Sequence, residues 1–127
     1  MVNVFLASFL KRYKSNIMAT FEDFQKLDIR VGKIVEVEKL PNAKYTTHKL
    51  IINFGDEVGK KASGARVVRY TKDQLIGKLV LGIVNLPPRQ IGKLSSETLT
   101  LGVPDASKEC ILISPDSNDA VIGGKLY

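Results

Sequence analysis

The residues best suited to chemistry in this sequence are cationic, and they are crowded into one short stretch. Lys60, Lys61, Arg66 and Arg69 fall within ten residues, and no acid interrupts them. Ammonium and guanidinium groups are the usual protein partners of phosphate oxygens in nucleic acids. In an extended strand Lys61 and Ser63 point to the same face, so an ammonium and a hydroxyl could reach one phosphate backbone. The stretch predicts a phosphate-binding surface; the alternative is a solvated edge strand whose charges oppose aggregation.

A second group of polar residues lies in and after the proline turn Leu86-Pro87-Pro88. Arg89 offers a planar fork for phosphate or a plate for a base, and Asn85 can bond sugar or base edges. Alternatively, Asn85 and Glu97 lock the turn to the body of the domain. The two groups together give the candidate RNA-binding set: Lys60, Lys61, Ser63, Arg66, Arg69, Asn85, Arg89, Lys93 and Ser96.

Catalytic and metal-binding patterns are missing from the sequence. His48 is the only histidine and Cys110 the only cysteine, so no metal-ligand spacing occurs. There is no serine-nucleophile motif, phosphate loop or dinucleotide fingerprint. Cys110 opens an apolar stretch and is expected to be a buried small hydrophobe. We therefore expect no enzyme, no metal and no cofactor.

Aromatic residues for stacking nucleic-acid bases are scarce. The chain has no tryptophan, Phe54 is expected to face the core, and only Tyr45 and Tyr70 fall in expected loops. Single-strand readers usually stack bases on several aromatic rings. This supply favours recognition of RNA shape and phosphates, with base stacking a minor contribution.

Length and charge bound the possible functions. The 127 residues suit one domain, and the net charge of +6 favours anionic partners. No apolar run approaches the ~20 residues of a membrane helix, which predicts no membrane insertion. The apolar start precedes its basic residues, unlike a secretory signal, and one cysteine suits a reducing, cytoplasmic location. Residues 1–20 form an expected N-terminal extension, either a dispensable appendage or a short amphipathic helix, ahead of a domain at 21–127.

The elements that must position these side chains are mostly short strands. Apolar residues alternate with polar ones at a period of two over 28–40, which predicts a long strand. Further strands are expected at 48–54, 61–68, 79–84, 97–101 and 110–114, of which 79–84 is the most apolar. Thr20 with Asp23, and Thr71 with Gln74, are spaced as capping boxes and predict helices ending near Leu27 and Gly77. A helix between the third and fourth strands predicts an all-β, five-stranded OB-fold Greek-key barrel with short helices and a C-terminal extension.

Apolar residues exceed what one small barrel can bury. The surplus near the chain ends and in loops predicts an exposed patch, which a two-fold homodimer would cover with the proline turn and 110–127 near the interface. The residues are Phe21, Phe24, Leu86, Ile91, Leu94, Val103, Ile111 and Ile113.

Three stretches resemble the tRNA-binding-domain family: Asp28–Ile34, Asn85–Pro88 and Leu94–Leu99. This family occurs as free-standing proteins, as C-terminal appendices of methionyl-tRNA synthetases, and in CsaA-like export-related chaperones. Lys49–Gly55, Arg69–Gly77 and the double proline are closer to the CsaA branch. Where RNA-binding relatives often have Arg-Gly, this chain has Gly92-Lys93.

The resemblance implies an OB-fold that dimerises and binds tRNA or another structured RNA. It leaves two functions open. The first is a non-enzymatic RNA-binding protein acting through a basic face of a homodimer. The second is a chaperone that binds unfolded or precursor polypeptides for export.

Overall fold

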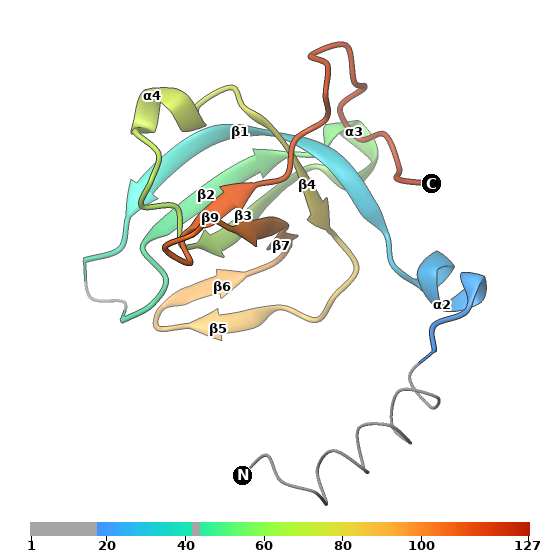
Figure 1. Cartoon of the computed structure of the whole chain (residues 1–127), viewed down its shortest axis with the longest axis horizontal. Helices are drawn as coiled ribbons and strands as arrows, with labels where there is room; N and C mark the ends of the chain where they lie inside the picture. Colours follow the sequence, from blue (N-terminus) through green and yellow to red (C-terminus); the bar gives the residue numbers. More distant parts are fainter. Residues whose placement is uncertain (1–17, 42–43) are drawn as a thin grey trace, which may run out of the picture.

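The computed structural model describes residues 18–41 and 44–127 (Figure 1). Five strands form an antiparallel sheet in the order β3-β2-β1-β4-β7, curled into a nearly closed barrel. The predicted all-β OB-fold is confirmed. The elements are α2 (Phe21–Lys26), β1 (Ile29–Lys39), β2 (His48–Asn53), α3 (Gly55–Val58), β3 (Lys60–Ala65), α4 (Lys72–Leu75), β4 (Leu79–Ile83), β5 (Arg89–Ile91), β6 (Leu94–Ser96), β7 (Leu99–Thr100), β8 (Gly102–Pro104) and β9 (Cys110–Leu112).

The long strand β1 bends the sheet because its two halves pair with different neighbours. Its first half pairs with β4 and its second half with β2. The β1–β2 register shifts between Ile34 and Glu36, an irregularity that increases local twist. Gly32 lies at the crossing. A β-carbon there would overlap Ile52 Cγ2 and lie 2.7 Å from a Phe54 ring carbon, so only glycine permits this approach.

The barrel interior is filled by aliphatic side chains around one phenylalanine ring. Phe54 is fully buried, as the sequence predicted. The rest of the buried cluster comes from β1, β2, β4, β9, α4 and the segment after β3: Ile34, Leu50, Ile52, Val67, Leu75, Val80 and Leu112. None of the eight surplus apolar residues belongs to the buried core of the described chain. The prediction that they do not all fit inside the barrel is therefore confirmed.

Both predicted capping boxes are present, because each depends only on residues three apart. The Thr20 hydroxyl accepts from the Asp23 amide at 3.1 Å, and the Asp23 carboxylate accepts from the Thr20 amide at 3.0 Å. Thr71 and Gln74 make the same reciprocal pair at 3.2 and 2.9 Å. Gly77 follows α4 with φ +85°, a left-handed conformation suited to glycine.

Several strand boundaries differ from the predicted ones. β3 ends at Ala65 rather than residue 68, because a turn closed by the Tyr70 amide on the Val67 carbonyl sends the chain towards α4. The strand predicted at 97–101 is reduced to β7. β5, β6 and β8 were not predicted from the sequence; they take part in two small hairpins, β5–β6 and β8–β9.

The C-terminal extension lies along the start of β1. The Gly123 and Leu126 amides donate to the carbonyls of Val31 and Ile29 at 2.7 and 2.8 Å. No helix in the described chain is long and apolar enough to cross a membrane. The expectation of a dispensable appendage or amphipathic helix falls largely on 1–17, outside the described residues, and stays a prediction.

Candidate nucleic-acid interface

Side chains, rather than a continuous backbone ladder, join β3 to the segment containing β6 and β7. The Gly64 amide donates to Ser96 Oγ at 2.9 Å, and the Ala62 amide donates to Glu97 Oε1 at 2.9 Å. The Glu97 amide returns a bond to the Ala62 carbonyl at 2.8 Å. These bonds close the barrel, so Ser96 and Glu97 have a structural role.

Ser63 and Ser96 were predicted to face RNA, and the structure shows both buried. Ser63 is fully buried, and its Oγ donates to the Thr98 carbonyl at 3.1 Å and lies 2.7 Å from Thr100 Oγ1. Ser96 Oγ also donates to the Thr98 carbonyl, at 3.3 Å. The expectation that Lys61 and Ser63 present one surface to phosphate is wrong for Ser63, because its hydroxyl is used inside the barrel.

Replacing Ser96 by alanine is expected to destabilise the protein by about 1–3 kcal/mol, because the Gly64 amide loses its buried acceptor. RNA affinity at a temperature where the variant is folded should stay within about twofold of wild type. Urea unfolding and RNA anisotropy measure the two quantities. A normal free energy of unfolding with weakened RNA binding would reverse this assignment.

Asn85 ties the loop after β4 to the junction between α2 and β1. Its Oδ1 accepts from the Asp28 amide at 2.8 Å, and its Nδ2 donates to the Lys26 carbonyl at 2.7 Å. Both ends of the amide are therefore engaged within the protein. Of the two readings left open for Asn85, the structure supports the one in which it locks the turn to the barrel.

Arg66 and Arg69 are engaged with carboxylates of the β8–β9 hairpin. Arg66 makes a two-pronged pair with Glu109, Nε to Oε1 at 3.0 Å and Nη2 to Oε2 at 3.1 Å, and this hydrogen bonding raises the pKa of Arg66. Arg69 Nη1 lies 3.0 Å from Asp105 Oδ2. The pKa of Asp105 is lowered, chiefly by the Glu109 amide. Both arginines help to hold this hairpin against the end of β3.

Four of the predicted cations form no ion pair with any described residue: Lys60, Lys61, Arg89 and Lys93. Lys60, Arg89 and Lys93 are exposed, and Lys61 is half-buried. Lys60 and Lys61 begin β3, while Arg89 and Lys93 belong to the β5–β6 hairpin that packs beside the same strand. The two predicted cationic groups therefore lie on neighbouring elements of the structure, β3 and the β5–β6 hairpin.

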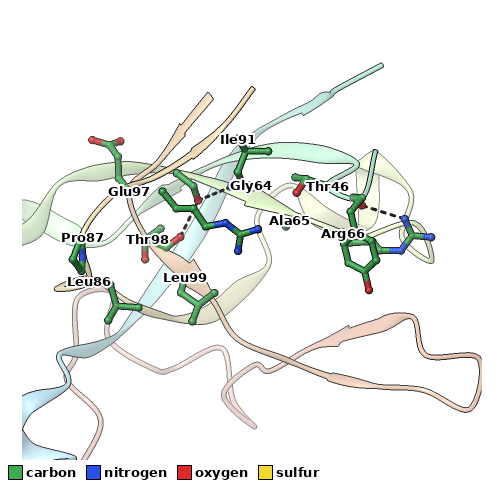
Figure 2. Close-up of a pocket in the computed structure, with 13 residues that line it drawn as sticks. Thr46, Gly64, Ala65, Arg66, Leu86, Pro87, Ile91, Glu97, Thr98 and Leu99 are labelled. Atoms are coloured by element: carbon green, nitrogen blue, oxygen red, sulfur yellow. Dashed lines mark hydrogen bonds between the residues drawn. The ribbon is translucent and has the colours of Figure 1, made fainter. Parts of the chain in front are cut away.

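A groove separates the β5–β6 hairpin from the loop before β2. It consists of two adjoining pockets of about 360 and 560 Å³ that share Tyr45, Thr46, Arg89 and Ile91, and we call it the hairpin groove. Figure 2 shows its first pocket, with Leu86 and Pro87 at one end and Arg66 at the other. Lys44 and Lys93 line the second pocket. Lys44 is a candidate site residue that the sequence analysis missed.

Gly64 lets the hairpin approach β3 closely enough to form this groove. A β-carbon on Gly64 would lie 2.7 Å from Ile91 Cδ1, 3.1 Å from Thr46 Cγ2 and 3.3 Å from Leu94 Cδ2. Two of the surplus apolar residues, Ile91 and Leu94, are thus half-buried over β3.

Arg30 bonds to two carboxylates and a backbone carbonyl, a role that was not predicted from the sequence. Its guanidinium donates to Asp28 Oδ1 at 2.6 Å, to Glu57 Oε1 at 3.1 Å and to the Gly123 carbonyl at 3.0 Å. Hydrogen bonding to Asp28, then to Glu57, raises the pKa of Arg30. It joins β1, α3 and the C-terminal extension, so this part of the Asp28–Ile34 motif has a structural role.

No set of three histidine, cysteine or acidic residues in the described chain is arranged to hold a metal ion. His48 is buried, its Nδ1 lies 2.7 Å from Thr47 Oγ1, and desolvation lowers its pKa. Cys110 is half-buried, and desolvation raises the pKa of its thiol. Its environment therefore disfavours the reactive thiolate.

The elements that carry Lys60, Lys61, Arg89 and Lys93 fall within a recognised family segment. The family model described as "Putative tRNA binding domain" matches residues 29–123. The chain belongs to this tRNA-binding-domain family. The match runs from the first residue of β1 to the C-terminal extension, and it includes both cationic groups and the hairpin groove.

Solved and curated relatives agree with this assignment. A CsaA chaperone protein from Picrophilus torridus is 42% identical with a TM-score of 0.80, covering 87% of this tRNA-binding-domain chain and 100% of its own. The chaperone CsaA from Bacillus anthracis is 38% identical with a TM-score of 0.74, covering 87% and 99%. A methionine–tRNA ligase of Thermococcus onnurineus is 38% identical over 96 residues, 76% of this chain; the match spans only 13% of the ligase.

Proposed function

We propose that this tRNA-binding-domain protein is a non-enzymatic module that binds tRNA or another structured RNA through phosphate contacts. The observation that carries the proposal is a set of cations on β3 and the adjoining β5–β6 hairpin that have no ion-pair partner among the described residues: Lys60, Lys61, Arg89 and Lys93. Ammonium and guanidinium groups that are not held by internal carboxylates are available to phosphate oxygens. As part of the same proposal, the protein is cytoplasmic, where tRNA is available to it.

Arg66 and Arg69 have a smaller role in this proposal than the sequence analysis gave them. Each must leave a carboxylate, Glu109 or Asp105, before it can bind phosphate fully. Ser63, Asn85 and Ser96 position strands and loops through internal hydrogen bonds. The RNA-binding set proposed from the structure is therefore Lys44, Lys60, Lys61, Arg89 and Lys93.

We also propose a homodimer. An apolar pocket between α2 and the C-terminus is lined by Phe21, Phe24, Leu27, Leu126 and Tyr127, together with Gln25 and Lys125. Phe21 is 70% exposed although it is a large apolar side chain. Contiguous exposed apolar surface typically marks an interface, and a two-fold dimer is the commonest way for identical chains to cover it. The dimer would carry two basic sides on one particle.

A salt titration of labelled bulk tRNA tests the proposed function. With about five neutralised phosphates per protomer, one for each cation of the proposed RNA-binding set, the log–log plot of affinity against salt should have a slope of about −4. Anisotropy at several salt concentrations gives the slope. Binding that varies little with salt, or no binding at the lowest salt, would contradict the proposal.

A polypeptide-binding role is the second candidate, favoured by the apolar lining of the hairpin groove. Leu40, Pro41, Ile91 and Leu94 line one pocket, and Leu86, Pro87 and Leu99 line the other. The two CsaA relatives named above are described as chaperones. Binding of a denatured polypeptide by this surface should change much less with salt than RNA binding does, so the same titration separates the two functions.

A further inference from the structure

Tyr45 presents an aromatic ring to solvent while one of its faces is backed by a fixed cation. Tyr45 is among the most exposed large hydrophobic residues of the described chain, at 74%. The central guanidinium carbon of Arg66 lies 5.2 Å from the ring centroid. Such a cation over an aromatic face is an attractive contact. The ring therefore has one occupied face and an opposite face that can accept a flat partner.

The backing of this ring is held in place before any ligand arrives. Arg66 is fixed by its two bonds to Glu109, and its Nη1 also donates to the Tyr45 carbonyl at 3.1 Å. Thr47, two residues along the chain, accepts at its Oγ1 from the Val67 amide at 3.1 Å. The loop that carries Tyr45 is thus bonded at two points to the segment after β3. The entropy cost of ordering this loop when a ligand binds is therefore small.

The surroundings of Tyr45 have the composition of a nucleotide site. Tyr45 lines both pockets of the hairpin groove. In the second pocket the charged residues of the described lining are Lys44, Arg89 and Lys93, with no carboxylate among them. An aromatic face can stack a base, and nearby cations can neutralise the phosphates on either side of it. A peptide would find apolar contacts here, but three cations without a carboxylate in this lining favour a polyanion.

We propose that Tyr45 is a stacking platform for one unpaired base of the bound RNA, with the adjoining phosphates held by Lys44, Arg89 and Lys93. This inference rests on the proposed RNA-binding function and narrows its ligand class. The preferred RNA carries at least one unstacked nucleotide beside a folded helix. This proposal revises the sequence-based expectation that base stacking is minor. One aromatic ring that is already held in position can stack a base even though the chain has few other aromatic residues in loops.

The chain has no tryptophan, so Tyr45→Trp places a single indole reporter at the platform. We expect an RNA stem-loop with unpaired loop nucleotides to quench the indole fluorescence of this variant as it binds. A blunt RNA duplex of equal length and charge should bind without comparable quenching. Tyr45→Ala should weaken stem-loop binding by about tenfold, within the range that stacking one base supplies, and duplex binding by less than about twofold. Tyr45→Phe keeps the ring and should restore stem-loop affinity.

Anisotropy of labelled RNA, recorded in parallel, separates the platform from the proposed function. If the stem-loop binds but neither quenches the indole of Tyr45→Trp nor loses affinity with Tyr45→Ala, the platform is wrong and RNA binding stands. If neither RNA binds wild-type protein, both proposals fail. If a denatured polypeptide changes the fluorescence of Tyr45→Trp while the stem-loop does not, the groove is a polypeptide site and the platform is wrong.

Discussion

Replacing Lys60 and Lys61 together by glutamate is expected to abolish measurable tRNA binding, a loss of at least about a hundredfold in affinity. The change removes two cations that have no ion-pair partner among the described residues and places two carboxylates against the phosphate backbone. Like charges brought together across an interface cost several kcal/mol. The fold should persist, since Lys60 is exposed, Lys61 is half-buried and neither makes an ion pair with a described residue that the change would break. Anisotropy and thermal melting measure binding and folding.

A matched control changes the same number of charges on other elements. Lys26→Glu with Lys72→Glu alters exposed lysines of α2 and α4, outside β3 and the β5–β6 hairpin. This variant should lose no more than about fivefold in affinity, the part due to net charge alone. Equal losses in the two double variants would show that long-range attraction, and no local contact at β3, explains binding. Unchanged affinity in a folded Lys60/Lys61 variant would remove this end of β3 from the interface.

Replacing Gly32 by alanine is expected to cost more stability than the same change at Gly64 or Gly82, the other glycines in strands of the five-stranded sheet. Its β-carbon would overlap Ile52 Cγ2 and press on the Phe54 ring, and all three residues are buried. Overpacking typically costs about 1–3 kcal/mol of folding stability. The backbone fixes the position of the added β-carbon, which meets both Ile52 and Phe54, so we expect this variant at or above the upper end of that range. Urea unfolding measures the change. A loss below about 1 kcal/mol would show that β1 can shift away from Phe54 at little cost.

Gly82→Ala supplies the matched comparison, because its β-carbon meets the same ring from a different strand. It would lie 2.8 Å from Phe54 Cζ and 3.1 Å from Thr98 Oγ1. Combining Gly82→Ala with Phe54→Leu should cost less than the sum of the single changes, since leucine lacks the ring atoms that clash. Strict additivity would mean that Phe54 is not what excludes a side chain at Gly82.

The sequence predicted best those features that depend on residues close together along the chain. Both capping boxes need only a threonine and a suitable side chain three residues later, and both were found as predicted. The sequence pattern, alternating in β1 and continuously apolar in β4, located β1, β2 and β4 within one residue at each end. It failed at β5, β6 and β8, which are three residues each and too short to display a period.

The roles of the other candidate site residues depend on hydrogen-bond partners that are distant in sequence, so they could not be predicted. Composition marks Arg66 as a free cation, but folding brings Glu109 to it from 43 residues away. The hydroxyls of Ser63 and Ser96 are equally able to bind phosphate or a backbone group, and only the barrel closure shows that they bind backbone. Lys44 becomes a candidate site residue only when folding places the β5–β6 hairpin beside it.

The side-chain closure of the barrel has a further consequence for how this protein meets extended chains. On the outer edge of β3, the amides of Ala62 and Gly64 are already occupied by Glu97 and Ser96, and the Ala62 carbonyl by the Glu97 amide. A free edge of this kind would be a template for strand addition and for amyloid-like growth. We expect this edge to accept no sixth strand, so a polypeptide client at β3 must be recognised by its side chains and not by its backbone.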